Sequence, residues 1–300
     1  MTPSDRRVAV RRLQERPGLS ERRGCLVVGV PRGTVRRRPK RAAADAALTE
    51  RIRELAYAHP RYGCPRVTAL LRRGGCGVNH KRVHRIWKAE GLSLRRRRPK
   101  RRRYGPRGER VNKATHRDHV WTYDFLEDRT ETGGKLRMLS ILDEYTRECL
   151  LLRVGRSTPA SRVIEALSWL LLTRGVPEHI RSDNGPEFIA YAVQDWLAKH
   201  RVKTLYIEPG HPWENGHIES FHDKLRDECL NRHIFRGVAD AQEVAEAWRV
   251  EYNTLRPHSS LGYETPEEFA ARAVSSGRAT PSLRLQRPDQ EKTLSLQLVP

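Results

Sequence analysis

The order of apolar segments between residues 119 and 231 is the feature that most constrains the fold of this chain of 300 residues. Three strand-like segments come first, at 119–128, 136–145 and 147–154. Helix and strand patterns then alternate, at 161–175, 178–183, 186–200, 202–207 and 214–231. A meander followed by alternating helices and strands predicts an α/β domain with a mixed five-stranded sheet and helices packed on it.

Basic residues are concentrated at the start of the chain. Residues 1–115 hold 34 Lys+Arg and 8 Asp+Glu, whereas residues 116–300 hold 24 and 28, giving +22 overall. A basic block joined to a near-neutral domain indicates a polyanionic partner, most simply nucleic acid. A merely solubilising tail is the alternative, but helical periodicity within the block argues against it. We therefore predict a basic helical DNA-binding region at 1–112, an α/β core at 113–273 and a flexible tail at 274–300.

Two parts of the basic region have helical patterns. Residues 20–37 read as two short helices around Gly29, with Ser20 as the cap of the first. This arrangement is typical of a helix-turn-helix, although an ordinary helical hairpin would have the same pattern. Residues 47–94 continue with further amphipathic helices. The first region is therefore predicted to be all-α and helix-turn-helix-like.

The last helix of this region, expected from Asn79 onward, has one apolar face and one basic face. The basic face carries Lys81, Arg85 and Lys88. Their i, i+4, i+7 spacing places them on one side of a helix, as contact with DNA phosphates would require. A solvated surface helix would have the same pattern. The linker "RRRRPKRRR" at 95–103 holds eight cations and one proline, which predicts an extended segment lying on phosphates.

Composition also excludes several classes of protein. No apolar run is long enough for a membrane span, and the N-terminus has no apolar core of a secretory signal. The five scattered cysteines, odd in number, favour a reducing cytoplasm over a disulfide framework. The side chains of Cys64, Cys76, His80 and His84 could together bind zinc. The set lacks a Cys-x-x-Cys pair, so these residues are interpreted as packing or surface residues.

Three acidic residues occupy unusual positions. Asp124 lies in the middle of an apolar strand, where an unpaired charge would be costly to bury. Asp183 ends the fourth strand, directly before a helix that begins near Pro186, and Glu219 lies on the last helix of the alternating series. The intervals contain 58 and 35 residues. Asp183 alone could be an Asx-turn or a helix cap.

These acids and their surroundings resemble the DDE transposases and retroviral integrases. The closest resemblance is to the second-open-reading-frame product of bacterial insertion sequences, carried by "SDNGPEF", "PGHPWENGHIESFHDKLRDECLN" and "YNTLRPHSSLGYETPEEF". Residues 47–95 resemble the helix-turn-helix-like region that precedes the core in such proteins. The resemblance covers about residues 20–270, and "FHDK" stands where relatives often have Asn-Gly after Phe.

The resemblance implies a ribonuclease H-like core in which Asp124, Asp183 and Glu219 are catalytic metal ligands. Two Mg²⁺ ions are implied, with Mn²⁺ as a substitute, because hard cations prefer carboxylate oxygens. Implied contacts to DNA come from Arg226, Asn184 and Asn215. Asp143 could be a fourth acid but is interpreted as support or surface. Arg256 and His258 could contact DNA or could pack the last helix on the core.

The resulting hypothesis is a transposase that cleaves the 3′ ends of an insertion element and transfers them to another strand. Its implied partners are double-stranded element ends and target DNA, further copies of itself, and possibly an upstream-frame product of the same element. A ribonuclease H-like nuclease that cuts without joining is one alternative. A catalytically silent DNA-binding protein derived from a transposon is the other, and the presence of all three acids argues against it.

Overall fold

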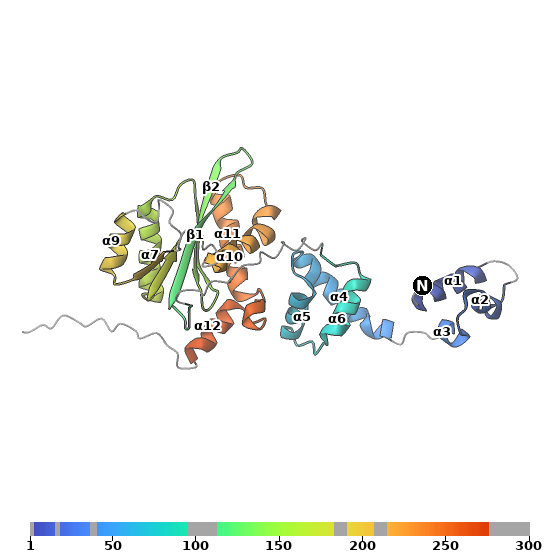
Figure 1. Cartoon of the computed structure of the whole chain (residues 1–300). Helices are drawn as coiled ribbons and strands as arrows, with labels where there is room; N and C mark the ends of the chain where they lie inside the picture. The colour runs from blue at the N-terminus through green and yellow to red at the C-terminus, as the bar shows by residue number, and fades with distance from the viewer. Residues whose placement is uncertain are drawn as a thin grey trace, which may run out of the picture. The chain divides into compact units, whose positions relative to one another are not determined.

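The structure is a computed structural model that describes residues 3–15, 19–36, 41–94, 113–182, 191–206 and 215–275. Contacts divide the chain into two compact units. The first unit comprises Met1–Val67 and Val78–Ser93, and the second comprises Thr68–Gly77 and Leu94–Pro300. Figure 1 shows the elements of both units in colours that run from blue at the N-terminus to red at the C-terminus.

A mixed five-stranded sheet forms the centre of the second unit. Its strands are β1 (Val120–Arg129), β2 (Lys135–Asp143), β3 (Cys149–Gly155), β4 (His179–Ser182) and β5 (Lys203–Tyr206). They lie in the order β3-β2-β1-β4-β5. β2 is antiparallel to β1 and β3, whereas β4 is parallel to β1 and β5. The predicted fold class, a ribonuclease H-like mixed sheet with helices, is confirmed.

Helices cover both faces of this sheet (Figure 1). Because side chains alternate along a strand, Trp121 and Tyr123 of β1 point to one face. There they pack with α7 (Ala160–Arg174) and α9 (Tyr191–Lys199). Leu126 points to the other face and packs with α10 (Gly216–Glu228) and α11 (Val238–Thr254). Asp124 shares the side of Leu126, so the alternation directs it toward the face covered by α10.

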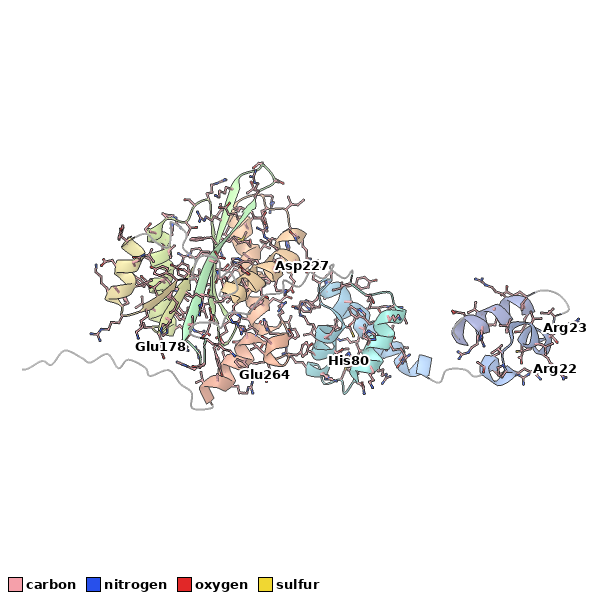
Figure 2. All side chains as sticks on the ribbon, viewed as in Figure 1. Arg22, Arg23, His80, Glu178, Asp227 and Glu264 are labelled. Carbon is pink, nitrogen blue, oxygen red and sulfur yellow. The ribbon has the colours of Figure 1, made fainter. Side chains whose placement is uncertain are left out.

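The first unit begins with three helices, α1 (Pro3–Gln14), α2 (Glu21–Val28) and α3 (Arg32–Arg36). They enclose a small core of Val10, Cys25, Val30 and Val35. Ser20 caps α2 by accepting from the Arg23 N–H at 3.4 Å, and Gly29 turns the chain with φ +66°, both as predicted. Helix α1 was not predicted, because its many arginines dilute the apolar pattern around Val10. Figure 2 shows Arg22 and Arg23, which are exposed on α2.

The helices that follow are α4 (Arg41–Ala58), α5 (Cys64–Arg73) and α6 (His80–Ala89). Asn79 caps α6, because its Oδ1 accepts from the Lys81 N–H at 2.9 Å. Val83, Ile86 and Trp87 of α6 are buried, which confirms the predicted apolar face. The linker at 95–103 lies outside the described residues. None of the helices described here is long and apolar enough to cross a membrane.

The core ends with α12 (Pro266–Ser275), preceded by the short 3-10 helices η2 (Leu230–Arg232) and η3 (Ser259–Leu261). Arg256, between α11 and η3, is buried and donates to both carboxylate oxygens of Glu228 at 2.6 and 2.7 Å. Its guanidinium also lies 5.3 Å from the centre of the Tyr252 ring. Of the two roles left open for Arg256, the structure therefore shows the packing role. The tail at 276–300 lies outside the described residues.

Candidate active site

Helix α10 runs alongside β1 in the same direction, as three contacts in order show. The Oγ1 of Thr122 donates to Asn215 Oδ1 at 3.0 Å, at the start of the helix. His222 Nδ1 lies 3.7 Å from Asp124 Oδ2. One turn later, Arg226 Nη2 donates to the backbone oxygen of Glu127 at 2.8 Å. The helix is thus held in a fixed register along the strand that carries Asp124.

This register places His222 beside Asp124, and Glu219 lies three residues earlier on the same helix. Three residues of helix rise about 4.5 Å, so Glu219 lies nearer the start of α10 than this contact does. Glu219 is also four residues after Asn215 and three before His222, so it shares the helix side on which both of them meet β1. Its side chain is exposed, whereas those of Asn215 and His222 are buried. Asp124 and Glu219 therefore lie on the two elements, β1 and α10, that pack against each other here.

His222 lies between the Asp124 side chain and Ser140 of the neighbouring strand β2. Its Nε2 lies 3.1 Å from the Oγ of Ser140, the residue that β2 places directly opposite Asp124. Burial, with a smaller contribution from the charge on Arg226, lowers the pKa of His222 to about 4, so its ring is neutral at pH 7. The carboxylate favours the tautomer with its proton on Nδ1, and Ser140 then donates to Nε2. Sequence reasoning did not assign this role, because only strand pairing brings Ser140 and Asp124 together.

The third predicted acid, Asp183, and its neighbour Asn184 lie outside the described residues. The described part of β4 ends at Ser182. Its last residue paired with β1 is Arg181, which lies opposite Thr122. The Nε of Arg181 donates to Glu144 Oε1 at 2.8 Å, and both side chains are almost fully buried. The end of β4 is therefore anchored in the protein interior next to β1.

Asp143, weighed as a fourth acid, is a structural residue. It is fully buried, and its carboxylate accepts from the backbone N–H groups of Asp118, Tyr145 and Thr146 at 2.7 to 3.1 Å. Arg174 lies within 3.5 Å of it. Burial raises the pKa of Asp143 to about 6. The carboxylate closes the turn after β2 and does not face solvent, so support, and not surface, is the correct interpretation.

The residues predicted to contact DNA differ in how exposed they are and in the groups that they bind. Asn215 is buried and hydrogen-bonded to Thr122, and Arg226 is bonded to a strand carbonyl, so both order the helix on the sheet. In α6, Lys81 and Lys88 are exposed. Arg85, also exposed, forms an ion pair with Asp45 of α4, and Arg82 binds the same carboxylate at 2.7 Å.

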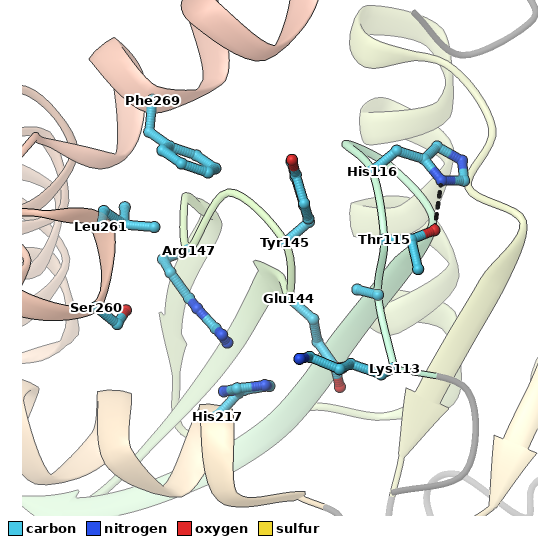
Figure 3. A pocket seen from close by; sticks show the side chains of 11 residues that line it. Lys113, Thr115, His116, Glu144, Tyr145, Arg147, His217, Ser260, Leu261 and Phe269 are labelled. Atoms are coloured by element: carbon cyan, nitrogen blue, oxygen red, sulfur yellow. Dashed lines mark hydrogen bonds between the residues drawn. The ribbon is translucent and has the colours of Figure 1, made fainter. Parts of the chain in front are cut away.

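A separate cavity of about 760 Å³ lies near the start of α10 (Figure 3). Tyr145 and Phe269, whose ring centres are 5.5 Å apart, form part of its wall. Lys113, Arg147 and His217 also line it. Neither Asp124 nor Glu219 belongs to its lining, so this cavity is distinct from the α10–β1 contact.

The donor set at the α10–β1 contact fits a hard divalent cation. Asp124 and Glu219 offer carboxylate oxygens, the ligand type that Mg²⁺ prefers. Asp124 Oδ1 accepts from the Phe125 N–H at 2.7 Å, and the side chain keeps 21% of its surface exposed. The hydrogen bond and the nearby neutral His222 orient the carboxylate, and its exposed part leaves room for an ion and for water.

Comparison with known proteins gives consistent matches along the chain. Family models described as "Integrase core domain" match residues 114–212 and 200–266, and one described as "HTH-like domain" matches residues 43–100. A protein of insertion element IS476 from Xanthomonas euvesicatoria is 38% identical over 94% of this chain and 82% of its own length.

Two further relatives also belong to insertion elements. A protein of IS407 from Burkholderia multivorans is 38% identical over 87% of this chain and 94% of its own. The transposase of IS904 from Lactococcus lactis is 26% identical over 78% of this chain and 97% of its own. Among solved structures, a chain of a simian T-cell lymphotropic virus intasome matches with a TM-score of 0.48 and 16% identity, covering 82% of this chain and 80% of its own.

Proposed function

Because the chain belongs to the insertion-element transposases, in which an HTH-like domain precedes an integrase core of the DDE superfamily, we propose that it cleaves and joins the ends of its own element. The reaction would be Mg²⁺-dependent cleavage at the 3′ end followed by transfer of the new 3′-hydroxyl to target DNA. The observation that supports this proposal is the docking of α10 along β1, which places the helix that carries Glu219 against the strand that carries Asp124.

We assign the metal ligands to Asp124, Asp183 and Glu219. Asp124 follows Thr122 by two positions, and Asp183 follows Arg181, the β4 partner of Thr122, by two positions. This equal spacing on paired parallel strands supports a common location for both acids. When bound, two divalent ions activate the attacking oxygen and stabilise the leaving one, and Mn²⁺ would serve in place of Mg²⁺.

The residues around the acids would act by positioning. His222 and the Phe125 N–H hold the Asp124 carboxylate in one orientation, so little reorganisation is needed when the site is loaded. Asn215 and Arg226 fix α10 on β1 and thereby hold the helix that carries Glu219 against the strand that carries Asp124. Remaining amide groups of Asn215 and Asn184 and the guanidinium of Arg226 are proposed to reach DNA from these positions.

DNA would be held by the basic region at 1–112, with Lys81, Arg85 and Lys88 of α6 on phosphates. For Arg85 this requires exchange of its Asp45 ion pair for a phosphate. We further propose that the protein acts as a homo-oligomer on paired element ends, and that an upstream-frame product of the element takes part. These last two proposals rest on the family alone.

The proposal is tested with a labelled duplex of the element end, Mg²⁺ and the full chain. Asp124→Asn, Asp183→Asn and Glu219→Gln should each reduce nicked and joined products at least about 10³-fold, because each removes a charged ligand but keeps the shape of the side chain. Binding of the duplex should remain within about threefold of the wild type. A variant with near-normal product formation would remove its residue from the ligand set.

The control is Glu165→Gln, which changes an exposed carboxylate of α7 in the same unit outside the α10–β1 contact. It should leave product formation unchanged. Nicking without joining by the wild type would favour a nuclease or an enzyme that needs its upstream-frame partner.

A further inference from the structure

A cluster of histidines and one carboxylate lies at the starts of β1 and β4, apart from the acids. His119, Glu178 and His179 each offer a ligand atom, and these atoms lie within 4.8 Å of one another. This is the one group of its kind among the residues that the structure describes. Asp124 follows His119 by five strand positions, about 16 Å along β1, so the cluster is separate from the proposed active site.

We propose that His119, Glu178 and His179 form a binding site for zinc or a similar first-row transition metal ion that ties the start of β1 to the start of β4. Two imidazoles and a carboxylate are ligands that such ions accept, whereas Mg²⁺ prefers an all-oxygen shell. Three protein ligands leave the fourth tetrahedral position for water. Figure 2 marks Glu178, whose side chain is 47% exposed and leaves a path for the ion.

The backbone of the site is already fixed by strand pairing. The His179 N–H donates to the His119 oxygen at 3.0 Å, and the Glu178 N–H donates to the Asp118 oxygen at 3.2 Å. A tetrahedral ion with bonds of about 2.1 Å holds its ligand atoms roughly 3.4 Å apart. The ligand atoms must therefore move by about 1 Å to reach this spacing, and rotation of their side chains achieves this without moving the sheet.

A second observation, made on the His179 side chain, independently supports the binding of an ion at this site. Its Nδ1 is buried and makes no hydrogen bond within the described part of the chain. Leaving such a polar atom unsatisfied costs free energy, and burial near His119 and Glu178 gives it few other partners. Binding of an ion within the cluster would supply a partner for this ring.

Neighbouring groups also supply the outer contacts that metal ligands need. His116 Nε2 lies 2.9 Å from Glu178 Oε1, so it can hold the carboxylate while Oε2, 3.8 Å from His119 Nε2, faces the ion. Thr115 offers His119 Nδ1 both a backbone N–H at 3.1 Å and a hydroxyl at 3.3 Å. Because Nδ1 accepts the backbone N–H in this structure, metal binding at Nε2 would move the ring proton to Nδ1 and exchange that hydrogen bond for one donated to the Thr115 hydroxyl. Figure 3 shows this threonine bonded to His116.

Binding of the ion would affect how firmly β1 and β4 are held together. β1 carries Asp124, and β4 leads to Asp183, so an ion bridging their first residues would fix these two strands at the end opposite to the acids. The effect would be on stability and strand alignment, since none of the cluster residues belongs to the proposed catalytic set.

The test is zinc stoichiometry on the full chain. The metal-free protein is equilibrated with Zn²⁺, separated from unbound ion and analysed by mass spectrometry of the metal. About one ion per chain is expected for the wild type, and a loss of at least tenfold for His119→Gln and His179→Gln. Zinc should also raise the Tm of the wild type by roughly 5 °C but leave the Tm of both variants unchanged.

Two controls exclude other sites. Asp124→Asn and the pair His80→Gln/His84→Gln should retain the zinc, and cobalt in place of zinc should show visible bands without thiolate charge transfer. Failure of the wild type to retain zinc would overturn the proposal. So would loss of zinc in either control, or a thiolate band that places the ion on cysteine. Circular dichroism of the metal-free variants confirms that they fold, so a loss of zinc reports on the ligands.

Discussion

At the scale of single residues, the carboxylate of Asp124 is held by groups that come from three elements. The Phe125 N–H comes from β1, His222 comes from α10, and Ser140 of β2 contacts His222 from the other side. Burial keeps His222 neutral at pH 7, so its ring lies 3.7 Å from the Asp124 carboxylate without neutralising the charge of that group. A neutral neighbour suits the role of cation ligand that we propose for Asp124.

His222 makes the stability of the protein depend on pH. Its pKa of about 4 in the folded chain lies below the value of about 6.5 in the unfolded chain, so unfolding takes up a proton between these values. The stabilisation is fully present above pH 6.5 and is lost as the pH falls toward 4. Between pH 7.5 and pH 5, this residue should lower the free energy of unfolding by about 2 kcal/mol.

Urea denaturation of the wild type and of His222→Gln at both pH values measures this contribution. The variant should lose about 2 kcal/mol less than the wild type on acidification, whereas His217→Gln, five positions earlier in the same helix, should behave like the wild type. Equal losses in all three proteins would mean that His222 titrates normally.

At the scale of elements, α10 is attached to the sheet along its side and to the following segment at its end. Asn215, His222 and Arg226 meet β1 and its neighbour β2 along one side of the helix. At the C-terminal end, Glu228 receives two hydrogen bonds from the buried Arg256. Since Glu219 lies on this helix, any shift of α10 along β1 would separate it from Asp124.

Removing Arg256 should therefore destabilise the core. Arg256→Leu leaves the buried Glu228 without its counter-ion, and the free energy of unfolding should fall by about 3–5 kcal/mol. The double variant Arg256→Leu/Glu228→Leu should recover most of this loss, because it removes both charges. The comparison is made by urea denaturation at pH 7.5.

An exposed ion pair provides the matched control for this prediction. Lys199 and Asp195 lie 2.7 Å apart on α9, with side chains 70% and 65% exposed. Lys199→Ala should change the free energy of unfolding by less than about 1 kcal/mol.

A double variant at positions 228 and 256 that is as unstable as Arg256→Leu would contradict the prediction. It would show that packing, and not charge, dominates the contact between these two residues.

At the scale of the whole molecule, the positive charge and the proposed metal ligands occupy different parts of the chain. Residues 1–115 carry all of the excess positive charge, whereas Asp124 and Glu219 lie in a part with slightly more acids than bases. This separation suits a protein that holds DNA through phosphates in one part and keeps a cation-binding acidic site in the other. A site of carboxylates inside the basic block would attract its arginines instead of a metal ion.

The basic part should give DNA binding a steep dependence on salt. For the full chain on an element-end duplex, the logarithm of the binding constant should fall linearly with the logarithm of salt concentration, by about 0.9 for each neutralised phosphate. Lys81→Ala/Lys88→Ala should reduce this slope by about 1.8, if each lysine contacts one phosphate. Fluorescence anisotropy between about 50 and 300 mM salt measures this slope.

Lys135→Ala is the control, because Lys135 lies on β2 and pairs with Glu127 at 2.7 Å. It should leave the slope unchanged. A salt response of the wild type that is nearly flat would contradict phosphate contact by the basic block.

Much of the fold was predictable because it follows from local patterns. The strand and helix order from residue 119 onward and the caps at Ser20 and Asn79 depend on neighbouring residues, and the structure agrees with them within a few positions. The α1 helix was missed because arginines interrupt its apolar face. The division of the chain at 112 and 273 and the roles of the site residues stay predictions.

The order of strands and helices, the basic character of the first region and the spacing of the three acids can be read directly from the sequence, because they require no knowledge of how distant segments pack. The contacts of His222 with Asp124 and Ser140, and the approach of His119 to His179, could be found only in the folded chain. These depend on strand register and helix docking, which join residues tens of positions apart. Packing sets such contacts, and no local pattern of residues encodes them.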